Sequence, residues 1–136
     1  MDSSIDIIAL VGEAGTGKTS AAIRAATWML KQNRVEEIIL CRAAVTFGEK
    51  IGFLPGDIRE KLDPFVAPVG DALKCLQNKA ESKRILKEAI VIPVGYLQGR
   101  TIQDAVAIVD EAQNLTWAQL EMVVTRLGRK GKIILC

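Results

Sequence analysis

Residues 5–19 read IDIIALVGEAGTGKT, and this stretch decides the fold. Six of its first seven residues are apolar and most of these are β-branched, which predicts a strand buried on both faces of a parallel sheet. Its last eight, GEAGTGKT at residues 12–19, fit the phosphate-binding pattern GxxxxGK[ST]. Apolar residues at helical spacing then run from Lys18 to about Gln32. Because the motif stands between a strand and a helix, the sequence predicts a site for nucleotide phosphates.

Each residue type of this loop has a physical task. Glycines 12, 15 and 17 allow the backbone to wrap around phosphates with its amides pointing inward. Lys18 is expected to bring its charge to the β and γ phosphates as a catalytic group, and Thr19 to offer its hydroxyl to Mg²⁺. The residues expected to bind the nucleotide are Gly12, Glu13, Ala14, Gly15, Thr16, Gly17, Lys18, Thr19 and Ser20.

A second motif, DEAQ at residues 110–113, follows the short apolar run AVAIV. Such a run predicts a buried strand whose carboxyl end carries the acidic pair. We expect Asp110 to hold Mg²⁺ and Glu111 to orient or deprotonate the attacking water. Gln113 is close enough in sequence to sense the γ phosphate, although an ordinary surface amide is the alternative.

The rest of the chain alternates strands with helices, which predicts a three-layer α/β/α fold around a mainly parallel sheet. Further strands are expected at residues 38–41, 89–94 and 132–136. A helix is expected over residues 71–87, in two pieces broken around residues 78–82. Another is expected from a capping box of Thr116 and Gln119 to Leu127, ended by Gly128. The long stretch from residue 42 to residue 70 is predicted to be loop with short helical turns.

Composition narrows the function further. With 136 residues, 49% of them hydrophobic, the chain fits one folded domain over residues 1–136. The absence of histidine excludes histidine-dependent triads, and the three cysteines lack metal or disulfide spacing. A net charge of +2 does not by itself indicate nucleic-acid or membrane binding. Because the first residues show no signal-peptide pattern, we expect a cytoplasmic protein without a membrane partner.

Several blocks of the sequence resemble the PhoH-like ATPase family, which is itself similar to the motor core of superfamily 1 helicases. The resemblance runs from about residue 7 to residue 135. Its most specific blocks are GEKIGFLPGDIREKLDPF at residues 48–65 and GRT at residues 99–101. Arg42–Ala43 stands where the family usually has Arg-Pro, and both ends look trimmed against the family pattern.

The resemblance implies a P-loop NTPase fold of the RecA type and a Mg²⁺-dependent ATPase that acts on RNA. It also implies single-stranded RNA as a partner and a homo-oligomer, such as a ring, in the intact protein. By the same likeness DEAQ corresponds to a magnesium aspartate, a catalytic glutamate and a coupling glutamine. Nothing in the sequence itself selects ATP over GTP.

Arginines are candidates for charge stabilisation in the transition state. Arg100 lies in the GRT block, Arg126 follows the helix after DEAQ, and Arg42 follows a strand. The alternatives are favourable charge at a helix end for Arg126 and a loop ion pair with Glu49 or Asp57 for Arg42.

Aromatic and basic residues of the long loop are candidates for RNA contact. The alternatives are aromatic anchors to the core and an ordinary solvated face. The candidates are Phe47, Phe53, Phe65, Lys50, Arg59 and Lys61.

Two other functions share the phosphate-binding loop. A small-molecule kinase would transfer phosphate to a hydroxyl, but the adjacent pair Asp110 and Glu111 favours water as the acceptor. A non-catalytic nucleotide-binding fragment would bind nucleotide without turnover.

Overall fold

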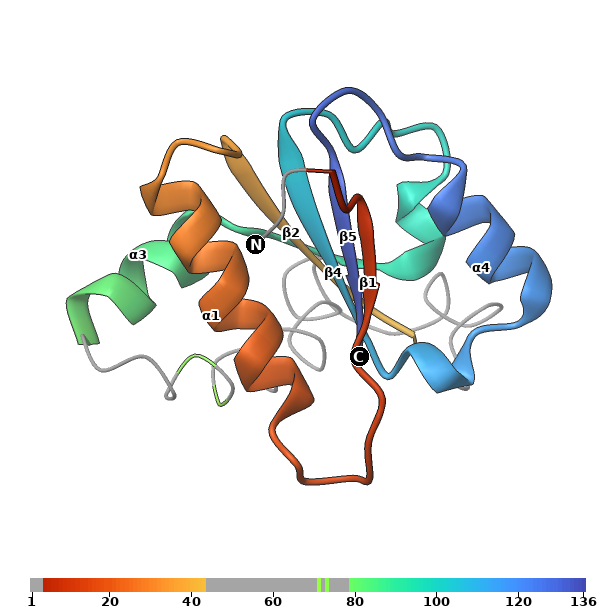
Figure 1. Cartoon of the computed structure of the whole chain (residues 1–136), viewed down its shortest axis with the longest axis horizontal. Coiled ribbons are helices and arrows are strands. Elements are labelled where there is room, and N and C mark those ends of the chain that lie inside the picture. Colours follow the sequence, from red (N-terminus) through yellow and green to blue (C-terminus); the bar gives the residue numbers. More distant parts are fainter. Residues whose placement is uncertain (1–3, 44–70, 72, 74–78) are drawn as a thin grey trace, which may run out of the picture.

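The computed structural model describes residues 4–43, 71, 73 and 79–136. Their strands form one parallel sheet in the order β1-β5-β4-β2-β3 (Figure 1). The strands are β1 (Ile7–Ala9), β2 (Glu37–Arg42), β3 (Ile90–Pro93), β4 (Ala105–Asp110) and β5 (Lys132–Leu135). The strand that precedes the glycine loop and the strand that carries DEAQ are therefore separated by β5.

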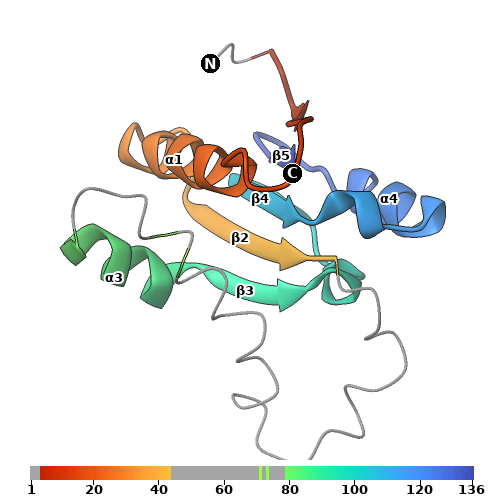
Figure 2. The ribbon, with the colours of Figure 1, turned by 90° about the horizontal axis from the view of Figure 1, so that it is seen from below.

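Helices cover both faces of this sheet (Figure 2). One face carries α1 (Lys18–Lys31) and α3 (Lys79–Glu88). The other carries the 3₁₀ turn η2 (Val94–Leu97) and α4 (Trp117–Val124). A second 3₁₀ turn, η3 (Ala112–Asn114), lies between β4 and α4. The three-layer α/β/α fold expected from the sequence is confirmed.

Each face of the sheet has its own apolar core because side chains alternate between faces along a strand. In β4, Val106 and Ile108 pack with α1, whereas Ala107 and Val109 pack under η2 and α4. All four are almost completely buried, so β4 is the central strand of the fold. The strand whose carboxyl end begins DEAQ is thereby anchored in both cores.

The first strand differs from the prediction. It spans only Ile7–Ala9, lies at the edge of the sheet, and leaves Ile7 38% exposed. Ile7 and Ala9 are exposed and Ile8 is only partly buried, so the predicted burial on both faces is wrong. Within the described residues β5 is the one strand that pairs with β1. An apolar run of this length does not show which strands will flank it.

Two helix predictions also need correction. The predicted break at residues 78–82 is wrong from Lys79 onward, where α3 is continuous. The capping box of Thr116 and Gln119 is confirmed, but α4 ends at Val124 and not at Leu127. The reason is tertiary: Leu127 and Gly128 leave the helix to pair with Ile102, whose carbonyl accepts a hydrogen bond from the Gly128 amide at 2.9 Å.

The segment after α4 packs too tightly for a side chain at Gly131. A Cβ there would lie 2.0 Å from the Ile102 carbonyl oxygen, which belongs to the backbone and cannot turn aside. We expect Gly131→Ala to reduce the free energy of unfolding by roughly 1–3 kcal/mol, measured by urea denaturation. Gly95→Ala is the control, because no atom lies within 4 Å of its Cβ position. Equal stability of the two variants would contradict this packing.

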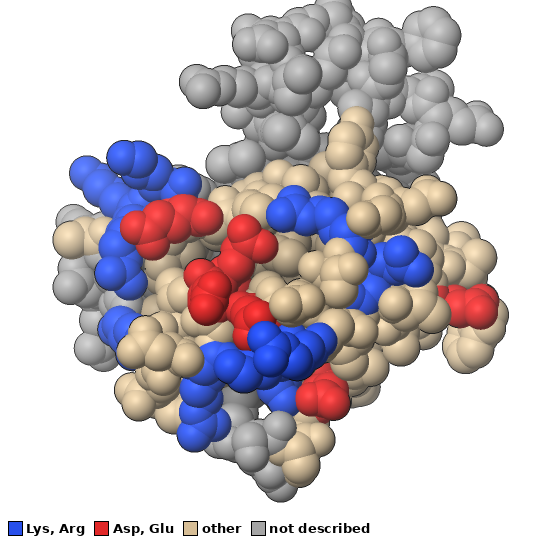
Figure 3. Space-filling view, turned by 90° about the horizontal axis from the view of Figure 1, so that it is seen from above, with Lys and Arg blue, Asp and Glu red and all other residues tan. Residues whose placement is uncertain are grey.

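The amino-terminal edge of the sheet carries paired charges (Figure 3). Lys132 donates to Asp6 at 2.7 Å, Arg100 lies 3.8 Å from Glu37, and Lys130 lies 3.7 Å from Asp104. Figure 3 shows the acidic side chains between groups of lysine and arginine. This edge is therefore not a continuous basic surface.

No helix in the described part of the chain is both long enough and apolar enough to span a membrane.

Candidate functional site

A cavity of about 730 Å³ lies at the carboxyl edge of the sheet, where open α/β sheets bind their ligands. The glycine loop after β1 and the turn after β4 form its walls. Its lining residues are Ala9, Leu10, Val11, Gly12, Ala14, Gly15, Gly17, Lys18, Thr19, Ser20, Asp110, Glu111, Ala112, Gln113, Leu120, Leu135 and Cys136.

The glycine loop presents the amino end of α1 to this cavity. Gly15 and Gly17 have φ angles of 78° and 85°, which side-chain-bearing residues rarely adopt. Gly17 is the N-cap, and among the described residues no side chain caps the helix. The first backbone amides of α1 are therefore available to an anion, and the helix dipole favours negative charge there.

Lys18 is held over the loop by the backbone. Its Nζ donates to the carbonyl oxygens of Gly12 and Glu13, both at 2.8 Å. Lys18 and the first residues of α1 line the same cavity, so this cavity offers both positive charge and backbone N–H donors. Such a combination suits a phosphate group.

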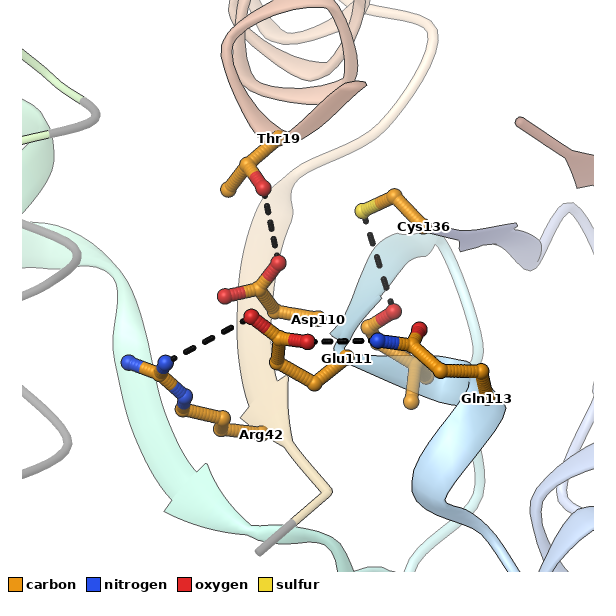
Figure 4. Close-up of polar contacts among 7 residues, drawn as sticks. Thr19, Arg42, Asp110, Glu111, Gln113 and Cys136 are labelled. Atoms are coloured by element: carbon orange, nitrogen blue, oxygen red, sulfur yellow. Dashed lines mark hydrogen bonds and ion pairs between the residues drawn. The ribbon is translucent and has the colours of Figure 1, made fainter. Parts of the chain in front are cut away.

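Thr19 and Asp110 meet across the cavity. The Thr19 hydroxyl donates to Asp110 Oδ1 at 2.7 Å, although the residues are 91 positions apart (Figure 4). Both are hard oxygen ligands of the kind that Mg²⁺ prefers. Within the described residues no group of three or more His, Cys, Asp or Glu side chains could hold a metal. A Mg²⁺ ion at Thr19 and Asp110 would thus complete its shell with phosphate oxygens and water, as such ions usually do.

Glu111 is held by two neighbours. Gln113 Nε2 donates to its Oε2 at 2.6 Å, and Arg42 Nη2 lies 3.6 Å from its Oε1 (Figure 4). Its backbone has φ 56° and ψ 38°, a left-handed conformation that is unfavourable for an L-residue. Strained residues of this kind concentrate at functional sites. The structure thus places the exposed Gln113 amide against the Glu111 carboxylate.

The two remaining candidate arginines lie outside this cavity. Arg100 pairs with Glu37 at the start of β2, the opposite end of that strand from Arg42. The backbone carbonyl of Arg126 accepts a hydrogen bond from the Ile102 amide at 2.8 Å. The side-chain Nε of Arg126 is buried without a hydrogen-bond partner among the described residues. The structure therefore does not bring Arg100 or Arg126 to the glycine loop within this chain. The alternative ion pair of Arg42 with Glu49 or Asp57 involves residues outside the described ones. Within the described residues, Arg42 Nη2 lies 3.6 Å from Glu111 Oε1.

Cys136 is a residue of the cavity that the sequence did not single out. It follows β5 and lies between the ends of β1 and β4, where it lines the cavity with Lys18 and Thr19. Its Sγ lies 3.7 Å from the Val109 carbonyl oxygen. Only the strand order brings it there, so no signal in the sequence could have identified it.

The two described thiols, Cys41 and Cys136, are buried and therefore expected to be inert. Burial raises the pKa of each from 9.0 to about 12, with the Asp110 charge adding to the effect at Cys136. The thiolate is the reactive form, so iodoacetamide at about pH 8 should label them on the order of 10²–10³-fold more slowly in the folded protein than in urea.

Raised thiol pKa values also imply a pH dependence. Each protonated thiol contributes fully to the free energy of unfolding below pH 9.0. This contribution is lost as the pH rises towards about 12, because the unfolded thiols lose their protons first.

In the iodoacetamide experiment, peptide mapping by mass spectrometry measures the labelling of Cys41 and Cys136 separately. Equally fast labelling of Cys136 in the folded and unfolded states would contradict its placement.

A parallel α/β sheet with this glycine loop, its lysine and a threonine beside a strand-end aspartate defines a P-loop NTPase domain. Comparison with known proteins gives the family. The profile of the family described as PhoH-like protein matches residues 1–136, and the chain belongs to that family of ATP-binding P-loop proteins. The predicted resemblance is confirmed.

Proteins from several bacteria are similar to this chain over nearly its whole length. A PhoH-like protein of Bacillus subtilis is 45% identical over 132 residues, covering 96% of this chain and 41% of the relative. One of Synechocystis is 46% identical over 131 residues, covering 95% and 40%. Protein PhoH of Escherichia coli is 40% identical over 135 residues, covering 96% and 38%. The chain thus spans about two fifths of the length of these relatives.

Proposed function

We propose that this chain is a Mg²⁺-dependent ATPase that releases the γ phosphate of ATP to water and couples this step to single-stranded RNA. The observation that carries the hydrolytic part is the contact of Thr19 with Asp110 at 2.7 Å beside the Lys18 ammonium. It joins two magnesium-type ligands to a phosphate-type cation in one cavity.

The proposed residue roles follow from this arrangement. The loop from Gly12 to Ser20 binds the phosphates, with Lys18 at the β and γ positions. Thr19 and Asp110 would hold Mg²⁺, which neutralises charge on the phosphates when bound. Glu111 orients or deprotonates the attacking water, and Gln113 positions the Glu111 carboxylate through its 2.6 Å hydrogen bond.

Glu111 also favours water over an organic acceptor. A kinase needs room and recognition for a second substrate, whereas a carboxylate directly after the magnesium aspartate suits activation of water. Phosphorus NMR of the products of Mg-ATP should therefore show inorganic phosphate in the presence of a metabolite mixture. Transfer of the phosphate to an organic hydroxyl would favour the kinase.

RNA coupling and oligomerisation as a ring rest on the family resemblance, and the proposed cytoplasmic location rests on the lack of a signal-peptide pattern in the first residues. The length and composition support residues 1–136 as one domain. Transition-state roles for Arg100 and Arg126, in cis or from a neighbouring subunit, are proposed from their positions in the sequence. The candidates Phe47, Phe53, Phe65, Lys50, Arg59 and Lys61 lie outside the described residues. Fluorescence anisotropy of a labelled single-stranded RNA, with and without Mg-ATP, tests the coupling. The proposal predicts an RNA affinity that changes with the nucleotide, whereas no binding in either state would contradict it.

A further inference from the structure

We propose that Arg42 is a positioning residue that binds the carboxylate of Glu111 in the absence of RNA. When a phosphate of a bound polynucleotide binds the Arg42 guanidinium instead, the Glu111 carboxylate is released. This inference rests on the proposed function and adds a physical link between RNA and the hydrolytic site. It concerns a residue that lies beside the nucleotide cavity and not in it.

The sheet itself brings Arg42 to Glu111. Arg42 is the last residue of β2, and the parallel register pairs it with Asp110 at the end of β4. The Ala43 amide donates to the Asp110 carbonyl at 2.9 Å, so the pairing of the two strands continues past Arg42. The guanidinium is thus fixed beside the residue that follows the magnesium aspartate, with Nη2 3.6 Å from Glu111 Oε1.

The two contacts of Glu111 differ in strength. The hydrogen bond from Gln113 is short, at 2.6 Å. The contact with Arg42 is an ion pair longer than a hydrogen bond, and its side chains are 30% and 39% exposed. Exposed ion pairs contribute little stability, and a phosphate can accept two parallel hydrogen bonds from one guanidinium. A phosphate can therefore displace Glu111 from Arg42 while Gln113 keeps its contact.

The strained backbone of Glu111 is typical of residues at active sites and switches. Its left-handed conformation persists only because the surroundings impose it. In the resting position the carboxylate is divided between Arg42 and Gln113 (Figure 4). The same residue lines the cavity that holds Lys18 and Thr19. Release from Arg42 frees one carboxylate oxygen to accept a proton from water in that cavity.

The competing phosphate comes from outside the nucleotide cavity. Glu111 and Gln113 line that cavity, whereas Arg42 does not, although it is partly exposed beside it. A γ phosphate held by the glycine loop would lie on the cavity side of Glu111. A polynucleotide that crosses the carboxyl edge of the sheet would meet Arg42 from the other side. The geometry thus favours a backbone phosphate of RNA over the nucleotide.

The test is steady-state ATP turnover by the full chain, with and without a single-stranded oligouridylate. Arg42→Gln should raise the RNA-free kcat by roughly three- to tenfold and leave the KM for Mg-ATP within about twofold. It should also lower the ratio of RNA-stimulated to RNA-free turnover to about one. Arg42→Lys keeps the charge but loses the bidentate geometry, so it should retain part of the stimulation.

Arg84→Gln is the matched control, because it removes an arginine from another exposed ion pair, with Glu88 on α3. It should leave both kcat and the stimulation ratio unchanged, and melting temperatures establish that all variants are folded. A stimulation ratio that stays at the wild-type value in Arg42→Gln would overturn the proposal. A fall in the RNA-free kcat of Arg42→Gln would also overturn it, because Arg42 would then stabilise charge on the γ phosphate during hydrolysis.

The wild-type protein separates this inference from the proposed function. If it releases no phosphate from Mg-ATP, the proposed ATPase fails. If it hydrolyses ATP at the same rate with and without the oligouridylate, the proposed ATPase activity is supported. The proposal that an RNA phosphate competes with Glu111 for Arg42 is then overturned.

Discussion

Lys18→Ala will abolish nucleotide turnover, with kcat/KM falling by at least about 10³-fold. The variant removes the one ammonium that the loop holds on the Gly12 and Glu13 carbonyls, at 2.8 Å each. The charge on the β and γ oxygens then loses its cation both in the bound state and in the transition state. Affinity should fall as well, by about 10- to 100-fold, as for the loss of a charge-assisted hydrogen bond.

Phosphate release measures the first effect, and calorimetric titration with Mg-ATP measures the second. Lys31→Ala is the control: it lies at the far end of α1, about 20 Å away along the helix axis. It should turn over ATP at the wild-type rate. Wild-type turnover by Lys18→Ala would show that hydrolysis occurs elsewhere.

Glu111→Gln will remove hydrolysis but retain nucleotide binding. The amide has nearly the same shape as the carboxylate but cannot accept the proton of the attacking water, so kcat should fall by about 10²–10⁴-fold. Affinity for Mg-ATP should change by less than about threefold, because Lys18, Thr19 and the loop amides are unaltered. The separation of kcat from affinity distinguishes this residue from Lys18.

Glu121→Gln serves as its control, because Glu121 is an exposed residue of α4 and does not line the cavity. Single-turnover mixing of protein with limiting Mg-ATP separates the chemical step from product release. A Glu111→Gln variant with a wild-type chemical step would exclude Glu111 as the base. A variant that also lost affinity would assign Glu111 to binding.

The parts of the site that were predictable from the sequence are local ones. The glycine loop, the beginning of α1 at Lys18 and the capping box at Thr116 each depend on residues within a few positions of one another. Asp110 could be placed at a strand end because AVAIV is a short apolar run bounded by charge. Features of this kind can be predicted because they depend on residues that are close together in the sequence.

The parts that could not be predicted depend on strand order and tertiary pairing. Insertion of β5 between β1 and β4 brings Cys136 into the cavity, and no local pattern encodes it. The contact between Arg42 and Glu111 joins the last residue of β2 to the residue that follows β4, and the adjacency of these two strands is not visible in the sequence. The early end of α4 has the same cause, since pairing with Ile102 removes Leu127 from a helix that its spacing would allow.

Release of inorganic phosphate from Mg-ATP by the wild-type chain, with and without single-stranded RNA, tests the central claim most directly. The arrangement of Lys18, Thr19, Asp110 and Glu111 predicts saturable release that requires Mg²⁺. The family resemblance adds the expectation that this release rises when RNA is present. The contradicting result is nucleotide binding that depends on Lys18 with no phosphate release in either condition. The chain would then hold the phosphates without hydrolysing them.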